Sequence, residues 1–263
     1  MDLMLKGKSV FVAAASKGLG KAVALQYAIE GARLTIASRS LDQLAQTRDE
    51  IRALTGIEAT VIQMDVSKGE DIRHAIRSAA EAHGGLDVLV TNAGGPPAGF
   101  FSDMEDADWA KGFELSLMST IRLIREAMPY LKSAIYGGRI VNLASTSIKQ
   151  PIDGLILSNV FRAGVNSLTK SLASELAGDG ILINTVAPGR IATDRIAELD
   201  RKRAADRHCS VEDIQTEANK QIPLGRPGTP EEFARHAVFY GSFANTYVTG
   251  QSLLVDGGMI KGL

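Results

Sequence analysis

Short, almost continuously apolar runs alternate along the chain with longer segments of helical period. The runs that have the strand pattern are 9–13, 33–37, 59–63, 88–91, 139–143, 182–186 and 252–255. Apolar residues at consecutive positions are typical of strands that are covered on both faces in a parallel sheet. The segments between them predict helices at 18–30, 41–54, 68–83, 113–132, 159–176 and 231–242. Ser40 and Thr229, the latter followed by Pro230, are the expected N-caps of the second and last helices.

This alternation predicts right-handed crossovers and an open, doubly wound α/β fold of the Rossmann type, with about seven parallel strands and helices on both faces. No linker or internal repeat interrupts residues 1–263, so we expect a single domain. The one break in composition is 194–220, which is dense in charge, and we expect a lid-like insertion at about 191–221. In such sheets ligands bind beyond the carboxyl ends of the strands, where the winding reverses.

Composition and charge exclude several classes of protein. The 29 basic and 30 acidic side chains give a net charge of −1, so no broad positive field for nucleic acid or an anionic membrane is expected. The single cysteine, Cys209, cannot form an internal disulfide, and no Cys/His cluster predicts a metal site. The apolar stretch 10–15 is too short for a signal peptide and no stretch is long enough for a membrane span. We therefore expect a cytoplasmic protein.

The turn after the first strand has the composition of a phosphate-binding loop. It reads Ala13-Ala14-Ala15-Ser16-Lys17-Gly18-Leu19-Gly20 and leads directly into a helix. Small residues let the backbone bend sharply beside a diphosphate, and the helix N-terminus offers free N–H groups. A glycine-rich turn between a strand and a helix can also be present only for close packing. The end of the second strand bears on which of the two applies.

The second strand ends at Ser38-Arg39, and no acidic residue lies between Glu30 and Asp42. A site for NAD places a carboxylate there for the ribose diol, whereas a site for NADP places an arginine there for the 2′-phosphate. Lys17 adds a second cation. The pattern favours NADP(H), with NAD(H) as the alternative, and it argues against an S-adenosylmethionine methyltransferase.

Further motifs follow the later strands in order. They are Asp65-Val66, Thr91-Asn92-Ala93-Gly94, Pro188-Gly189 with Ile191 and Thr193, Ile222-Pro-Leu-Gly-Arg226, Thr229-Pro-Glu-Glu232, Val248-Thr-Gly-Gln251 and Val255-Asp-Gly-Gly258. With them the chain resembles the short-chain dehydrogenase/reductase family, of the 3-oxoacyl-carrier-protein reductase kind, nearly from end to end. Ala14 stands where the family has its first loop glycine.

The resemblance implies a role for each motif. Asp65 and Val66 would contact the adenine, and Asn92, Ala93 and Gly94 would line the ribose. Pro188, Gly189, Ile191 and Thr193 would lie beneath the nicotinamide. The family usually forms dimers or tetramers through the helices 113–132 and 159–176 and the C-terminal strand, so a homodimer or homotetramer is expected.

The expected catalytic positions depart from the family. Ser145 stands in the place of the serine that hydrogen-bonds the substrate carbonyl. The family's Tyr-x-x-x-Lys falls on Ser158 and Arg162, and its helix asparagine falls on Ser116. Ser158 and Arg162 are four residues apart, so they share one face of the helix. From there Arg162 could still bind the ribose hydroxyls of the cofactor or a carboxylate of the substrate.

The changed site leaves the proton donor open, because serine is a far weaker acid than tyrosine and arginine stays charged. Three interpretations remain. The first keeps reduction of a small carbonyl, or oxidation of an alcohol, with Ser145, Ser158 and a water passing the proton, or with Lys149 as the acid. The second is a nucleotide-binding protein without turnover, and the third is a non-redox reaction. The first is favoured because Ser145 and the nicotinamide segment are retained.

Two further features carry alternatives. Phe100 and Phe101 could form an apolar wall of the substrate pocket or pack on the core. The basic residues of the lid could attract an anionic substrate or could simply be solvated; they are Arg195, Arg201, Lys202, Arg203 and Arg207.

Overall fold

The computed structural model describes residues 1–262, and within them seven parallel strands form one sheet in the order β3-β2-β1-β4-β5-β6-β7. The strands are β1 Ser9–Ala13, β2 Arg33–Ser38, β3 Thr60–Gln63, β4 Val88–Thr91, β5 Arg139–Leu143, β6 Leu182–Pro188 and β7 Ser252–Val255. The helices are α1 Gly18–Ile29, α2 Leu41–Thr55, α3 Gly69–His83, α4 Asp106–Phe113, α5 Ser119–Lys132, α6 Ile156–Leu176, α7 Asp194–Arg207, α8 Val211–Lys220 and α9 Pro230–Tyr240. The predicted fold class is confirmed.

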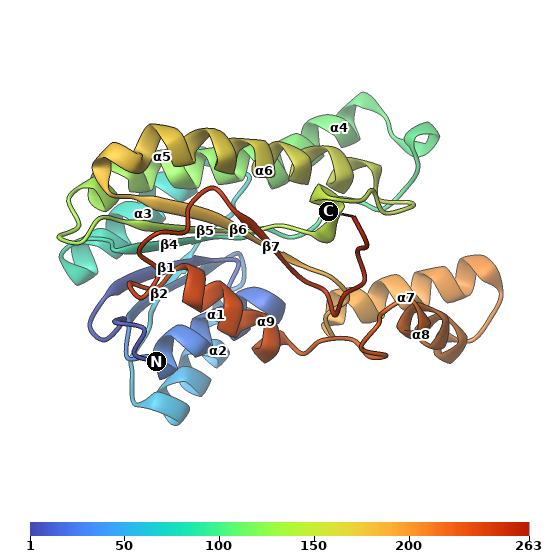
Figure 1. Ribbon diagram of the computed structural model, residues 1–263, viewed down its shortest axis with the longest axis horizontal. Coiled ribbons are helices and arrows are strands. Elements are labelled where there is room, and N and C mark those ends of the chain that lie inside the picture. The colour runs from blue at the N-terminus through green and yellow to red at the C-terminus, as the bar shows by residue number, and fades with distance from the viewer. Residues whose placement is uncertain (263) are drawn as a thin grey trace.

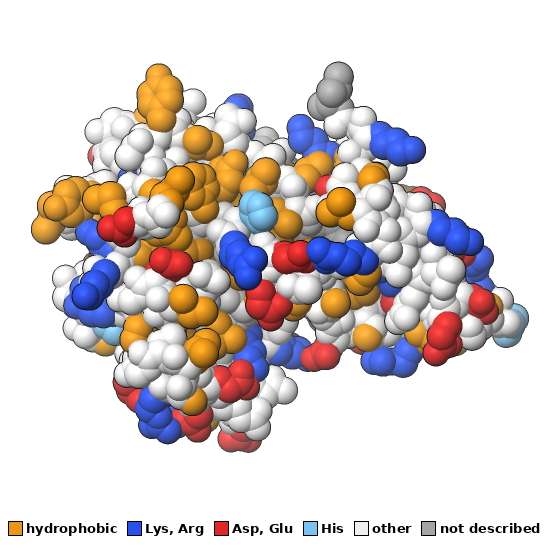
Figure 2. Space-filling model, turned by 60° about the horizontal axis from the view of Figure 1, so that its bottom comes forward, with side chains coloured by type: hydrophobic (Ala, Val, Ile, Leu, Met, Phe, Trp, Pro, Cys, Tyr) orange, Lys and Arg blue, Asp and Glu red, His pale blue; other side chains and the backbone are white. Residues whose placement is uncertain are grey.

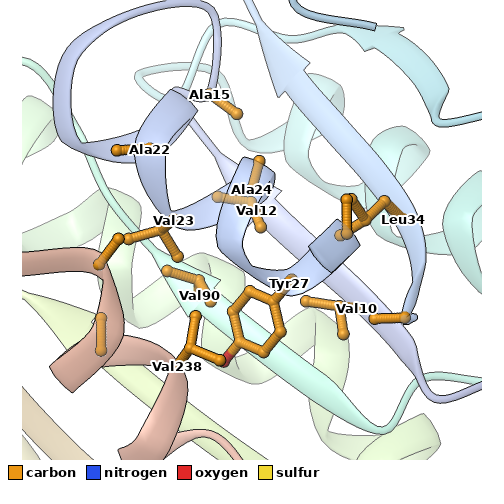
Figure 3. Close-up of a cluster of buried hydrophobic side chains, with 14 of the residues drawn as sticks. Val10, Val12, Ala15, Ala22, Val23, Ala24, Tyr27, Leu34, Val90 and Val238 are labelled. Carbon is orange, nitrogen blue, oxygen red and sulfur yellow. The ribbon is translucent and has the colours of Figure 1, made fainter. Parts of the chain in front are cut away.

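Helices cover both faces of this sheet (Figure 1). The helices α1, α2 and α9 lie on one face, and α3, α5 and α6 lie on the other. Each face has its own core of buried apolar side chains. In the first core the Tyr27 ring is fully buried among Val10, Val238 and their neighbours (Figure 3). Its hydroxyl has no hydrogen-bond partner within the described chain.

The predicted caps are confirmed. The Ser40 hydroxyl accepts from the Gln43 N–H at the start of α2. At the start of α9, the Thr229 hydroxyl accepts from the Glu232 N–H, and the Glu232 carboxylate accepts from the Thr229 N–H, with Pro230 as the first helical residue. These reciprocal bonds satisfy N–H groups that the helix itself leaves free.

The predicted helix 113–132 is wrong in extent. The structure has α4, then a π-helical segment Glu114–Met118, and then α5. The hydroxyls of Ser119 and Thr120 donate to the carbonyls of Leu115 and Ser116, where the regular i to i−4 pattern is interrupted. These local bonds depend on backbone geometry that the hydrophobic pattern does not encode.

Residues 194–220 form α7 and α8, which stand out from the rest of the molecule in Figure 1. They follow β6 at the carboxyl edge of the sheet, which is the edge where the candidate site is expected. Within residues 1–262 no helix is long and apolar enough to cross a membrane.

Candidate functional site

The loop between β1 and α1 is closed by tight backbone contacts. Ala14 has a left-handed backbone with φ of 48°, and a Cβ on Gly20 would come within 2.3 Å of the Ala14 carbonyl oxygen. Asn92, after β4, donates from Nδ2 to the same oxygen at 3.3 Å. Any residue other than glycine at position 20 would therefore force the backbone at Ala14 to move. Ala14 adopts the left-handed backbone conformation, which costs an L residue about 1–2 kcal/mol.

The start of α1 is open to an anion. Its N-cap residue, Lys17, is exposed and makes no side-chain capping bond. The carbonyl of Ser16 accepts from the Thr47 hydroxyl at 3.3 Å, which holds the loop against α2. Gly18 has φ of 58°, and Leu19 is half-buried. An uncapped helix N-terminus beside a tightly bent small-residue loop fits a diphosphate.

This loop lies where the winding of the sheet reverses. The chain runs outward from β1 to β3 and then returns to β4 on the other side of β1. Asn92 and Ala93 are half-buried after β4, and Gly94 is exposed. The predicted loop and the predicted ribose-lining residues therefore come together at the position where such sheets bind ligands.

The ends of β2 and β3 and the start of α3 border an open pocket of about 570 Å³. Its lining comprises Arg39, Gln63, Asp65, Lys68, Glu70, Asp71 and His74. Ser38 and Val66 are buried beside it, whereas Lys17 is not among the lining residues. The pocket is thus bounded by both cationic and acidic side chains, with Arg39 at its exposed edge.

The Asp65 carboxylate is held in its charged form. Burial alone would raise the pKa of Asp65, but hydrogen bonds from the Ser67 N–H and hydroxyl and the charges of Arg39 and Lys68 outweigh burial and lower the pKa. Asp65 therefore presents an acceptor at this end of the site.

The Pro-Gly segment at the end of β6 is packed closely on the C-terminal segment. A Cβ on Gly189 would lie 2.5 Å from the Cβ of Asp256, and the Gly189 N–H donates to the Val255 carbonyl at 2.9 Å. Pro188 ends β6, Ile191 is buried, and Thr193 is the N-cap residue of α7. The segment therefore follows one fixed course along the carboxyl edge of the sheet.

Ser145 follows β5 and begins a 3-10 turn, Thr146–Ile148. Its Oγ accepts from the Ser147 N–H at 3.2 Å. Because the hydroxyl is used as an acceptor there, its own proton is left to donate elsewhere. This turn packs against α6, the helix that carries Ser158 and Arg162.

Ser158 is half-buried in the first turn of α6, and Arg162 lies one turn later and is 6% exposed. The Arg162 guanidinium donates from Nη1 to the Leu143 carbonyl at 3.0 Å and from Nη2 to the Ala93 carbonyl at 3.3 Å. It thereby joins the ends of β4 and β5. Burial lowers the pKa of Arg162 to about 10, so the side chain remains charged at neutral pH.

Ser116 lies in the π-helical segment and is fully buried. Its hydroxyl has no hydrogen-bond partner within the described chain. A buried, unpaired hydroxyl is unusual, and this one lies at the residue matched to a helix asparagine on the strength of the resemblance alone.

Two other predicted features are exposed. Lys149 lies at the end of the turn after Ser145 and is exposed to solvent. Phe100 and Phe101 are 61% and 73% exposed, so they do not pack on the core. The Phe101 ring instead meets Trp109 edge-on.

Comparisons with known proteins agree with this geometry. The model of the family described as enoyl-(acyl carrier protein) reductase matches residues 13–260. The chain is 32% identical to a 3-oxoacyl-[acyl-carrier-protein] reductase of Aquifex aeolicus over 259 residues, which cover 98% of this chain and all of that protein.

The chain belongs to the short-chain dehydrogenase/reductase family. It is therefore an oxidoreductase of that family. It is 33% identical to glucose 1-dehydrogenase of Gluconobacter oxydans over 260 residues, covering 96% of this chain and 92% of that protein. The crystal structure of L-sorbose reductase from Gluconobacter frateurii, complexed with NADPH and L-sorbose, matches with a TM-score of 0.94 at 31% identity over all of both chains.

Two arginine contacts of this family member were missed in the sequence. Arg190, after the Pro-Gly motif, forms an ion pair with Asp200 of α7, and Asp200 is 1% exposed. Arg195 of α7 donates to the Pro96 carbonyl at 3.3 Å. The charge-rich composition of 194–220 indicated an exposed segment, and nothing in that pattern singles out a buried aspartate.

Proposed function

We propose that the protein is an NADP(H)-dependent oxidoreductase that reduces a small carbonyl compound, or oxidises the alcohol, through a variant catalytic site. The proposal is carried by the loop in which Ala14, Gly20 and Asn92 meet at the reversal of the sheet. Such a loop leaves main-chain N–H groups for a diphosphate. Arg39 supports the phosphorylated cofactor, and NAD(H) is the alternative for the same loop.

The residues around Ser145 suit polarisation of a carbonyl. When bound, the reduced nicotinamide supplies the hydride. The Ser145 hydroxyl, oriented by the Ser147 N–H, donates to the substrate oxygen as negative charge develops there. Ser158 relays a proton from a water molecule, since its own hydroxyl is too weak an acid to be the ultimate source.

Arg162 serves this site through position and charge. Its two bonds to main-chain carbonyls fix the segments that carry Ala93 and, two residues after Leu143, Ser145. Its buried positive charge favours a developing oxyanion nearby. We therefore regard Arg162 as a positioning residue, because its two hydrogen bonds go to backbone carbonyls of this chain.

A second candidate function is nucleotide binding without turnover or with a non-redox reaction. It is favoured by the chemistry of Arg162, because a guanidinium that bonds two backbone carbonyls and stays charged is a poor replacement for a lysine that takes part in proton relay. The two candidates share the cofactor site and differ in whether a hydride and a proton are transferred between the cofactor site and the substrate.

The test is a substrate screen of the purified protein with NADPH and NADH against ketones, quinones and 3-oxoacyl compounds. Loss of nicotinamide absorbance with at least one substrate, faster with NADPH than with NADH, is expected. The Ser145→Ala variant should lose most of this activity. Binding of nucleotide with no absorbance change on any substrate would favour the second candidate.

The assembly expected from the family is also part of the proposal. β7 is the edge strand of the sheet and is half-buried along its whole length, which leaves it free to lie against a second copy. We propose a homodimer or homotetramer in the cytoplasm, the location resting on the sequence alone. Sedimentation equilibrium that gives the mass of one chain would refute the assembly.

A further inference from the structure

Arg195 extends from the lid to the loop that follows β4. Its Nη2 donates to the Pro96 carbonyl at 3.3 Å and lies 3.4 Å from the position of a Cβ on Gly95. Gly95 and Pro96 follow directly on Gly94, whereas Arg195 comes two residues after Thr193. The guanidinium therefore connects the two chain segments that leave the carboxyl ends of β4 and β6, where this class of sheet binds its ligands.

Most of the hydrogen-bonding capacity of this guanidinium is unused. Arginine has five N–H donors, and Arg195 uses one of them on Pro96. Its acidic neighbour, Glu198, is 3.6 Å away, and the two side chains are 44% and 66% exposed. An exposed pair at this distance contributes little, so a ligand can displace Glu198 at small cost.

The other two arginines at this edge are already committed. Arg190 is paired with the buried Asp200, and Arg162 is bonded to two backbone carbonyls. Of these three arginines, Arg195 is the one that a ligand can reach from solvent, because its side chain is 44% exposed whereas that of Arg190 is 10% exposed and Arg162 is buried.

The lid as a whole does not create a field of one sign. Figure 2 shows acidic and basic side chains interspersed over the part formed by α7 and α8, on the right. In α7 the basic residues are opposed by Asp194, Glu198, Asp200 and Asp206. Arg195 is therefore expected to bind one anionic group through a pair of hydrogen bonds from its guanidinium. The mixed charge of the lid does not favour a large polyanion as ligand.

We propose that Arg195 is a specificity-determining residue that binds a carboxylate of the substrate, so that the substrate is a small oxo acid or the corresponding hydroxy acid. This rests on the proposed oxidoreductase function and names its substrate class. A carboxylate matches the planar guanidinium with two parallel hydrogen bonds, which a neutral ester cannot reproduce.

Calorimetry with matched probes tests the proposal without turnover. Pyruvate, acetoacetate and levulinate place the carbonyl at increasing distance from the carboxylate, and each is compared with its methyl ester, with and without NADPH. At least one acid should bind roughly tenfold to a hundredfold more tightly than its ester. Arg195→Gln should abolish this preference, and Arg195→Lys should restore part of it.

Two further variants make the test specific. Glu198→Gln removes the competing carboxylate and should tighten binding of the acid severalfold. Arg201→Gln, on the same helix, is the matched control and should leave the preference unchanged, because the bond to the loop after β4 is made by Arg195 and not by Arg201.

The failures of the two proposals are distinguishable. If NADPH does not bind but the acid is preferred through Arg195, the oxidoreductase function fails and the carboxylate site stands. If NADPH binds while every acid and ester bind alike, or bind not at all at millimolar concentration, the Arg195 proposal is overturned. Retention of the preference in Arg195→Gln overturns it as well.

Discussion

The bonds of Arg162 give a quantitative prediction for the variant Arg162→Lys. In the wild type one guanidinium satisfies the Leu143 and Ala93 carbonyls, which lie at the ends of different strands. A lysine ammonium is a point donor on a flexible stem and cannot span both acceptors in a fork. The variant keeps the positive charge, so the change isolates the geometry of the donor.

The expected cost follows from the carbonyl that loses its partner. Leaving one buried polar group unsatisfied costs about 1–3 kcal/mol of unfolding free energy. For a chain of this size, 1 kcal/mol corresponds to roughly 2–4 °C in melting temperature. We therefore expect Arg162→Lys to melt about 2–12 °C below the wild type.

Thermal and urea unfolding followed by circular dichroism measures this difference. Arg201→Lys, an exposed substitution of the same chemistry, should change the unfolding free energy by less than about 0.5 kcal/mol. An Arg162→Lys variant as stable as the wild type would refute the interpretation of Arg162 as a link between β4 and β5. The double variant Ser158→Tyr with Arg162→Lys restores the family pair, and a gain of ketone reduction would support the alignment.

Three other changes follow from single contacts. Tyr27→Phe removes a buried hydroxyl that has no partner in the described chain, and we expect about 1 kcal/mol of stabilisation in urea unfolding; a less stable variant would contradict this. The Arg226 guanidinium and the Thr229 N–H lower the pKa of Glu232 to about 2, so the stability this carboxylate contributes is complete above its ordinary pKa and is lost as pH falls toward 2. Melting temperatures of Glu232→Gln and the wild type should therefore converge on acidification, and a constant difference would count against the ion pair. Gly20→Ala places a Cβ 2.3 Å from a carbonyl oxygen, and fluorescence titration should show loss of nucleotide binding; wild-type affinity would contradict the packing of the loop.

The architecture could be predicted because it depends on a pattern that the sequence displays. Consecutive apolar residues in the central strands β1, β4 and β5 reflect burial on both faces. The sequence predicts these strands and β7 with their observed bounds. The remaining strands differ by one or two residues at an end, at Ser38, Ala59, Ala187 and Pro188. Three of these are buried, so the ends of the strands are set by hydrogen bonds to the neighbouring strand, which the apolar pattern does not show. The π-helical segment around Ser116 interrupts a continuous helical pattern, and local hydroxyl bonds of this kind leave no periodic signal.

The part of the candidate site that could be predicted is the part carried by motifs directly after a strand, because these motifs lie at the carboxyl edge of the sheet. The positions of Gly20, Asn92 and Ser145 at the carboxyl edge follow from the topology once the strands are known. The partners of Arg162 and Arg195 are backbone carbonyls, which every residue carries, so no side-chain pattern reveals them. The ion pair between Arg190 and Asp200 depends on how α7 folds back, which the composition of the lid does not determine.

The central claim is that the loop between β1 and α1 binds a pyridine nucleotide and that Arg39 selects the phosphorylated form. Calorimetric titration of the wild type and Arg39→Ala with NADPH and NADH measures both parts of the claim together. The wild type should bind NADPH more tightly than NADH, and Arg39→Ala should weaken NADPH binding roughly tenfold while leaving NADH unchanged. The absence of binding of either nucleotide at millimolar concentration would contradict the account.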